Sequence, residues 1–251
     1  MSRPARPALG KKGVRCLGVA ESFRLGGPPK SVFAGVVMRK DLLIDGAALS
    51  LATVGGDDAT DAVLDLYGQL AREDVGFLMV SGAIVSWFNF VDPERIWRET
   101  GRPVIVLTYR ASRGLEGVIR SRFGDRWEEK LEAYRRLGPR ERVELHTGFR
   151  VYVRSAGLSD REVVRALNDF TIQGRYPEPV RVAGLLARAA LRLMEGIQHQ
   201  PPLDRGAGRP PVRSSRSRDG ARGPWTTPPP SRDAQGSRPP RAGRCARRPG
   251  P

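Results

Sequence analysis

Side chains that build disulfides and zinc sites are scarce in this sequence of 251 residues, which contains only 2 Cys and 2 His. Cys16 and Cys245 are far apart and too few for a disulfide framework, so a reducing compartment is expected. His146 and His199 lie in unrelated places and do not complete a zinc site with the cysteines. A metal ion is therefore expected to have oxygen ligands, as magnesium or manganese does, and zinc is excluded.

Long apolar runs are also missing. No run approaches the roughly 20 apolar residues that cross a bilayer, and residues 1–12 lack the apolar core of a secretory signal. The sequence has no G-x-x-x-x-G-K-S or G-x-x-x-x-G-K-T phosphate loop, no dinucleotide fingerprint and no nucleophile elbow. These absences predict a cytoplasmic protein without a nucleotide cofactor, and they argue against nucleoside triphosphatases, dehydrogenases and serine hydrolases.

Positive charge is in excess, with 43 Lys+Arg against 27 Asp+Glu and a net charge of +16. Residues 200–251 contribute 12 Arg and 3 Asp, so this segment carries more than half of the excess. It consists mainly of Arg, Pro, Gly and Ser, which cannot bury enough surface to offset the entropy lost on ordering. We predict a folded domain over residues 1–199 and a disordered Arg/Pro/Gly-rich tail over residues 200–251.

The first half of the folded part predicts a mixed sheet. Apolar runs at 14–20, 31–38 and 42–51 are separated by short turns, which indicates an antiparallel meander of three strands. Apolar residues at helical spacing predict an amphipathic helix over 57–72. The nearly continuous apolar run at 75–85 is typical of a buried parallel strand.

The second half predicts one more buried strand and mainly helices. The elements are a short helix begun by Asp92 and Pro93, a strand over 103–109, two helices within 115–137, a strand over 143–154, a helix capped by Ser159 with Glu162, and a last helix from Pro177 to about Gln198. The order of three meandering strands, a helix, a buried strand, a helix and another buried strand is that of the ribonuclease-H-like fold. The predicted fold class is therefore α/β, with a three-strand meander plus parallel strands flanked by helices.

Several long strings carry a resemblance to a known family. They are KKGVRCLGVAESF (11–23), SVFAGVVMRKDLLIDG (31–46), TVGGDDATDAV (53–63), VSGAIVSWFNFVD (80–92) and PEPVRVAGLLARA (177–189). Through them the chain closely resembles the archaeal family DUF99, also called UPF0215, over residues 11–195. That family is distantly similar to endonuclease V. The resemblance implies a magnesium-dependent cut in nucleic acid near a deaminated base.

The resemblance to endonuclease V also implies three carboxylates that hold a metal ion. Glu21 is the carboxylate nearest the end of the first strand, and Asp57 and Asp58 lie near the first long helix. At the third position, where endonuclease V has an aspartate, this chain has Ser81, and a serine hydroxyl is a poor ligand for magnesium. We predict Glu21, Asp58 and Ser81 as catalytic positions, and Glu21, Asp57 and Asp58 as ligands of Mg or Mn.

Each of these residues also has a structural interpretation. Asp57 and Asp58 suit the capping of the first long helix, an alternative that we favour for Asp57. Glu21 follows an apolar strand, where an ionisable group is costly unless it is paired, exposed or bound to a ligand. Trp87 follows the buried strand at a place where open α/β sheets bind ligands; it suits stacking on a base and, equally, packing against the core.

Basic side chains near the start and on one face of the last helix are candidates for phosphate contacts. They are Lys11, Lys12, Arg181, Arg188 and Arg192. A solvated helix face is the alternative explanation. The sequence as a whole predicts an endonuclease-V-like, nucleic-acid-binding protein with divalent-metal-dependent phosphodiesterase activity; the alternative is a noncatalytic binding or adaptor protein on a degenerate fold. It leaves open the substrate, the base preference and the oligomeric state.

Overall fold

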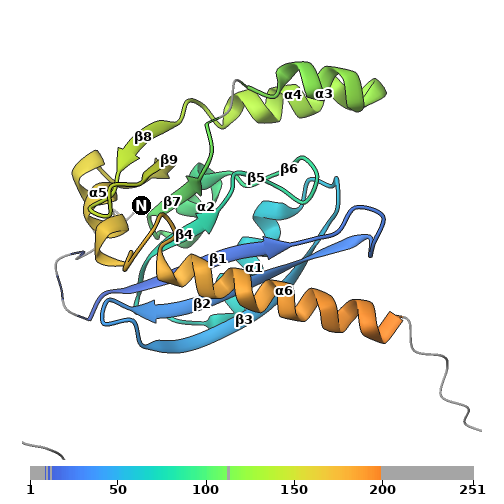
Figure 1. The fold of residues 1–251 in the computed structure, drawn as a ribbon. Coiled ribbons are helices and arrows are strands. Elements are labelled where there is room, and N and C mark those ends of the chain that lie inside the picture. The colour runs from blue at the N-terminus through green and yellow to red at the C-terminus, as the bar shows by residue number, and fades with distance from the viewer. Residues whose placement is uncertain (1–8, 10, 12, 112–113, 199–251) are drawn as a thin grey trace, which may run out of the picture. The chain divides into compact units, whose positions relative to one another are not determined.

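The computed structural model describes residues 9, 11, 13–111 and 114–198, and the structural statements below concern these residues. Its centre is a seven-stranded sheet with the order β3-β2-β1-β4-β7-β9-β8 (Figure 1). The predicted tail over residues 200–251 and the predicted phosphate contact Lys12 lie outside the described residues. No helix among the described residues is long and apolar enough to cross a membrane.

The first half of the sheet confirms the predicted meander. Strands β1 (Arg15–Ser22), β2 (Lys30–Arg39) and β3 (Ile44–Thr53) are antiparallel neighbours. Strands β4 (Val75–Ser81) and β7 (Val104–Thr108) then run parallel to β1. The carboxyl ends of β1, β4 and β7 therefore lie at one edge of the sheet, where open α/β sheets bind their ligands.

The other end of the sheet corrects one prediction. In place of a single strand over 143–154, the chain forms a hairpin of β8 (Glu141–Glu144) and β9 (Arg150–Ala156). The turn contains Gly148 with a φ of 78°, a conformation that glycine adopts without steric cost. Strand β9 is antiparallel to β7, so the beginning of β9 lies at the same edge as the end of β7.

Helices cover both faces of the sheet. On one face, α5 (Asp160–Asp169) and α6 (Glu178–Gln198) pack against the sheet, with α6 over β1 and β2. On the other face lie α1 (Ala59–Leu70) and α2 (Pro93–Thr100). A Cβ atom on Gly18 of β1 would lie 2.3 Å from the carbonyl carbon of Pro179, so only glycine admits α6 this close to the sheet.

Helix α3 (Glu116–Arg122), the 3-10 turn η1 (Gly124–Arg126) and helix α4 (Trp127–Arg136) form a third group of elements. In Figure 1, α3 and α4 lie above the small hairpin of β5 (Ile84–Val85) and β6 (Asn89–Phe90). Phe90, Ile119 and Leu131 join this hairpin to the helices through a small apolar cluster. The predicted strand over 75–85 is shorter than expected, because it ends at Ser81, directly before Gly82 with its positive φ.

Two predicted helix starts are confirmed in detail. The side chain of Asp92 accepts hydrogen bonds from the backbone N–H groups of Glu94 and Arg95 at 2.9 and 3.1 Å. Ser159 and Glu162 form a capping box at the start of α5. These local signals are reliable because each one satisfies backbone N–H groups that have no partner inside the helix.

Candidate functional site

Glu21 lies near the end of β1 on the face that is covered by α1, since it is two residues beyond Val19 and strand side chains alternate. Its Oε1 accepts a hydrogen bond from the backbone N–H of Ser86 at 3.2 Å. Its Oε2 is buried and has no hydrogen-bond partner among the described residues. Burial raises the pKa of Glu21, and the hydrogen bonds from Ser86 oppose this shift. A half-buried carboxylate with one unsatisfied oxygen is costly for the folded state.

The segment that contacts Glu21 has unusual backbone geometry. Ser86, Trp87 and Phe88 have φ angles of 43°, 59° and 61°, which place three consecutive non-glycine residues in the left-handed region. Such residues cost on the order of 1–3 kcal/mol each and persist where the surroundings fix them. We refer to residues 86–88 as the strained turn.

Hydrogen bonds from several elements hold the strained turn in place. The Ser86 Oγ donates to the Oγ of Ser31 on β2 at 2.6 Å, and the N–H of Gly55 donates to the carbonyl oxygen of Ser86 at 2.7 Å. The Nζ of Lys130 on α4 donates to the carbonyl oxygen of Phe88 at 3.1 Å. The turn is therefore tied to the sheet, to the segment before α1 and to α4.

Lys130 is a central residue that the sequence interpretation missed. Its side chain is 1% exposed, and its Nζ also donates to the carbonyl oxygens of Gly55 and Gly56 at 3.3 and 2.7 Å. The Nζ lies 5.6 Å from the centre of the Phe90 ring. Lys130 stands between Trp127 and Leu131 in the apolar stripe of α4, and this helical spacing is the signal that would have predicted its burial.

Asp57 belongs to this arrangement as the partner of two cations. Lys130 and Arg126 both form ion pairs with its carboxylate. Partial burial alone would raise the pKa of Asp57, but the hydrogen bonds from Lys130 and Arg126 hold it below its usual value. Asp57 therefore anchors α4 to the segment before α1, and its side chain does not cap α1, contrary to the alternative that the sequence favoured.

Asp58 stands at the N-cap position of α1 but makes no side-chain cap hydrogen bond. Its carboxylate accepts hydrogen bonds from the backbone N–H and the hydroxyl of Thr53 and from the Nδ2 of Asn89, at 2.7–3.0 Å. Asn89 takes over the capping role, since its Oδ1 accepts from the N–H of Ala59 at 2.9 Å. Partial burial raises the pKa of Asp58, and these hydrogen bonds outweigh that effect and lower it.

Ser81 ends β4 next to β1. The register that pairs Val19 with Val80 places Glu21 beside the residues that follow β4. The hydroxyl of Tyr109 lies near Ser81, and it is buried with no hydrogen-bond partner assigned to it among the described residues. Burial raises the pKa of this phenol, and the neighbouring Ser81 opposes the shift.

The predicted metal ligands occupy three different environments. Among the described residues, no group of three His, Cys, Asp or Glu side chains is placed to hold a metal ion. Asp57 is engaged by cations and Asp58 by hydrogen-bond donors, whereas Glu21 keeps one buried oxygen without a partner. Of the three predicted metal ligands, Glu21 is thus the one whose carboxylate has an oxygen without a partner in the described part of the chain.

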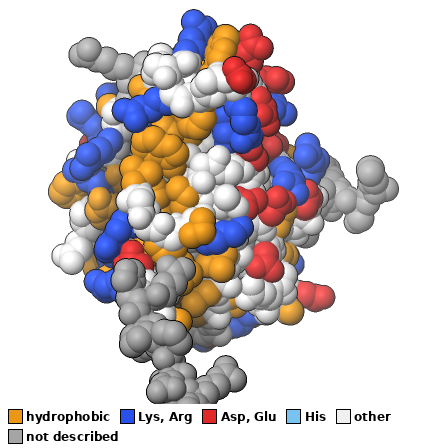
Figure 2. Space-filling model, turned by 90° about the vertical axis from the view of Figure 1, so that its right-hand side faces the viewer, with side chains coloured by type: hydrophobic (Ala, Val, Ile, Leu, Met, Phe, Trp, Pro, Cys, Tyr) orange, Lys and Arg blue, Asp and Glu red, His pale blue; other side chains and the backbone are white. Residues whose placement is uncertain are grey.

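The predicted nucleic-acid contacts are spread over the surface. Arg181 pairs with Glu178 at 2.6 Å, while Arg188 and Arg192 are exposed on α6 and Lys11 is exposed near the start. Trp87 is half-buried, with the guanidinium of Arg122 5.4 Å from the ring centre. Figure 2 views the molecule from the right-hand side of Figure 1 and shows a band of hydrophobic side chains, with Lys and Arg on both sides of the band and Asp and Glu mainly on one side.

Comparison with known proteins places this site in a family context. Residues 12–191 match the family described as Endonuclease dU. A UPF0215 protein of Pyrobaculum calidifontis is 38% identical over 172 residues, which cover 68% of this chain and 93% of that protein. A protein of unknown function from Archaeoglobus fulgidus superposes with a TM-score of 0.61 and 27% identity, over 70% of this chain and 98% of the other.

Endonuclease V shares the fold. The enzyme of Ciona intestinalis, in complex with a 24mer DNA that contains an inosine followed by a ribo-adenosine, has a TM-score of 0.50 and 12% identity. The match covers 73% of this chain and 88% of that enzyme. At this identity the likeness concerns the fold alone, and it confirms the ribonuclease-H-like architecture expected from the sequence.

Proposed function

Since the chain belongs to the Endonuclease dU family, we propose that it is an endonuclease that cuts DNA close to a deaminated base, and the family name suggests deoxyuridine, the nucleoside that carries the deaminated base uracil. The inosine in the DNA bound to Ciona endonuclease V is also a deaminated nucleoside, which supports this substrate class. The proposal fits a basic protein with a net charge of +16, because a phosphate backbone attracts positive charge.

One observation carries the proposal. The buried, unpartnered Oε2 of Glu21 lies at the edge where β1, β4 and β7 end, next to the strained turn. A raised carboxylate pKa and backbone strain are both costly for the folded state, and both are typical of catalytic sites. Glu21 is therefore the residue that we assign as general base, taking a proton from the water that attacks a phosphodiester.

The other site residues position this carboxylate. Lys130, Ser31 and Gly55 fix the strained turn, and the N–H of Ser86 in that turn orients Oε1 of Glu21. Asp58 and Asn89 fix the segment that leads into α1. We propose Asp58 as a positioning residue, because its carboxylate oxygens already accept hydrogen bonds from Thr53 and Asn89.

The divalent cation that the resemblance to endonuclease V implies fits this site through one residue. Glu21 has the unpartnered oxygen that a hard cation prefers, and magnesium is commonly held by one or two carboxylates together with phosphate oxygens of the substrate. When bound, such an ion would neutralise charge on the phosphodiester. Asp57 and Asp58 would have to give up their present partners before they joined it.

Cleavage of defined oligonucleotides tests the proposal. The substrates are labelled DNA strands with a single deoxyuridine, a single deoxyinosine or no deaminated base, incubated with manganese. We expect cleavage near the deaminated base, and a loss of about 100-fold or more in the Glu21→Gln variant. The exposed Glu73, which precedes β4 at the opposite edge of the sheet, provides the matched control Glu73→Gln.

The second candidate is a nucleic-acid-binding protein without catalytic activity. It is favoured by the separate environments of Asp57 and Asp58 and by Ser81 at the third position. Binding of DNA that contains deoxyuridine, with no cleavage by the wild-type protein, would support this candidate. Equal cleavage by wild-type protein and Glu21→Gln would refute the catalytic role of Glu21.

A further inference from the structure

A second feature of the same sheet edge is a cavity of about 300 Å³ beyond the ends of β4 and β7. Gly82, which follows Ser81, forms part of its wall, and Thr108 at the end of β7 forms another part. The β8–β9 hairpin contributes Arg154. The cavity is therefore next to the candidate active site but is built largely from elements that the proposed reaction does not use.

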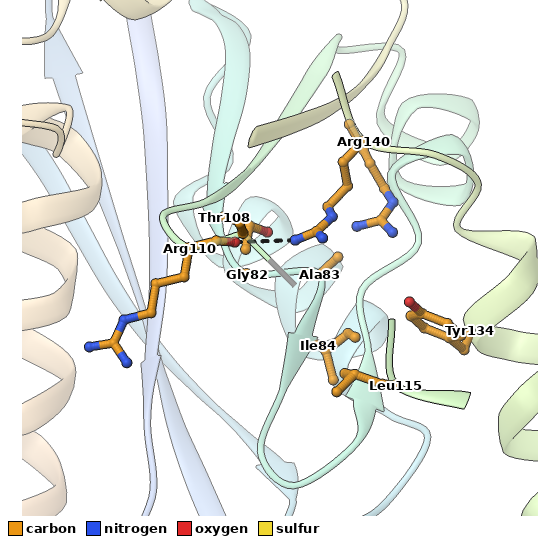
Figure 3. Close-up of a pocket in the computed structure, with 10 residues that line it drawn as sticks. Gly82, Ala83, Ile84, Thr108, Arg110, Leu115, Tyr134 and Arg140 are labelled. Atoms are coloured by element: carbon orange, nitrogen blue, oxygen red, sulfur yellow. Dashed lines mark hydrogen bonds between the residues drawn. The ribbon is translucent and has the colours of Figure 1, made fainter. Parts of the chain in front are cut away.

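The cavity is cationic. Arg140 and Arg154 line it, and the described residues in its lining include no Asp or Glu. The Nη1 of Arg140 donates to the carbonyl oxygen of Arg110 at 3.4 Å, and Figure 3 shows the side chain of Arg110 extending away from Arg140. The Nε of Arg154 donates to the carbonyl oxygen of Gly138 at 3.0 Å.

Arg154 is the most informative of these residues. It is half-buried, and among the described residues the structure gives it no ion pair. Burial lowers the pKa of Arg154, and the charge of Arg140 lowers it further. Arg154 therefore bears the cost of burial and of a neighbouring like charge without an ion pair of its own among the described residues, and a bound anion would reduce that cost.

The two guanidinium groups and the apolar lining of the cavity indicate which kind of anion fits. A guanidinium group has a planar fork of N–H donors that matches phosphate oxygens, and two such groups converge here. Figure 3 shows Tyr134, Ile84 and Leu115 together on the side of the cavity below Arg140. An aromatic ring and aliphatic side chains beside a cationic wall suit a nucleotide, whose base and sugar contact the apolar wall.

We infer that this cavity binds a phosphate group of the DNA strand through Arg140 and Arg154, with the adjoining nucleoside against Tyr134. The inference rests on the proposed function for the identity of the strand, and it adds a binding subsite to the cleavage site. The phosphate is either the terminal monoester of a strand or an internal diester. Both have the same chemistry, and the experiment below distinguishes them.

Binding is measured by fluorescence anisotropy on the full-length protein with catalysis prevented by EDTA. The probes are three labelled single-stranded DNAs: one with a 5′ phosphate, one with a 5′ hydroxyl, and a long strand with both ends far from the deaminated base. The variants are Arg154→Met and Arg140→Met, and Arg161→Met on α5 is the control for the loss of one positive charge. All of these proteins carry the same segment 200–251, so its contribution cancels in the comparison.

We expect Arg154→Met and Arg140→Met to weaken binding by roughly tenfold or more. Each phosphate contact that is lost on a single strand should also reduce the slope of log K against log salt concentration by about 0.7. Arg161→Met should bind nearly as the wild type does. A loss confined to the 5′-phosphorylated probe assigns a terminal monoester, and an equal loss on all three probes assigns an internal diester. Either pattern supports the inference.

Two further measurements test whether Arg154 itself binds the phosphate. Inorganic phosphate, compared with chloride at equal ionic strength, should raise the melting temperature of the wild type but not of Arg154→Met. Arg154→Lys keeps the positive charge but lacks the planar set of N–H donors of a guanidinium group. It should therefore bind DNA more tightly than Arg154→Met and more weakly than the wild type. Wild-type binding by both methionine variants overturns the inference. Weakened binding without any cleavage by the wild type leaves the subsite in place and refutes only the nuclease.

Discussion

The cost of burying Glu21 gives the sharpest prediction, which is that Glu21→Gln stabilises the protein at neutral pH. The buried Oε2 has no hydrogen-bond partner in the described part of the chain, and an unsatisfied buried polar atom costs about 1–3 kcal/mol, more when it is charged. Glutamine keeps the shape and the acceptor for the N–H of Ser86 but removes the charge. For a domain of this size, each kcal/mol corresponds to a rise of about 2–4 °C in melting temperature.

The pH dependence of this gain follows from the raised pKa. Between the ordinary pKa of a glutamate, 4.5, and the higher value in the folded state, the folded protein holds a proton that the unfolded chain releases. The stability of the wild type must therefore fall, relative to the variant, as the pH rises through this window. Below it both residues are neutral in both states, and the difference should become small.

Urea unfolding of wild type and Glu21→Gln at about pH 4 and about pH 7.5, in the presence of EDTA, measures this difference. The control Glu73→Gln removes an exposed carboxylate and should change stability by less than about 0.5 kcal/mol. A variant that is less stable than the wild type at neutral pH, or a difference that does not depend on pH, would refute the reasoning.

Four further outcomes are expected. Lys130→Met should destabilise the protein by about 2–4 kcal/mol, because three carbonyl oxygens lose their donor. Lys40→Met removes a lysine whose side chain is more exposed and which pairs with Asp169, and it should cost less than about 1 kcal/mol. Ser81→Asp should increase cleavage in manganese, and unchanged activity would count against a catalytic position there. Millimolar manganese should raise the melting temperature much more with DNA present than without it, because Glu21 offers one unpartnered oxygen; equal rises would show that the protein alone holds the ion. Limited trypsin digestion should leave a resistant fragment that ends near residue 199, and a resistant tail would contradict the predicted domain boundary.

The sequence predicted the meander, the buried parallel strands and several helix starts because the signals for these elements are local. The meander and the buried strands β4 and β7 follow from runs of apolar residues, and the starts of α2 and α5 follow from capping residues that satisfy nearby N–H groups. The β8–β9 hairpin was missed because alternation continues through a short turn in which Gly148 gives the main break. The short β5–β6 hairpin has too few residues for any periodicity.

The partners of the candidate site residues could not be predicted in the same way. Asp57 and Lys130 are 73 positions apart, and Glu21 and Ser86 are 65 positions apart, so no local pattern joins them. The sequence identified Glu21 because a carboxylate after an apolar strand is unusual by itself. It did not identify Arg154, since an arginine within an alternating strand is ordinary until the tertiary structure places Arg140 beside it.

The two edges of the sheet differ in how their charges are satisfied. At the edge where β1 and β4 begin, Arg15 and Arg72 each pair with both Asp45 and Asp74, and the charges compensate one another. At the opposite edge lie the unpartnered oxygen of Glu21, the strained turn and the two neighbouring guanidinium groups of Arg140 and Arg154. A fold selected for stability alone would not concentrate these costs at one edge, because strain and buried charge are removed by simple substitutions. Their joint position at the carboxyl ends of β1, β4 and β7 is therefore an argument for a ligand, and a phosphate strand would compensate the arginines and face Glu21 together.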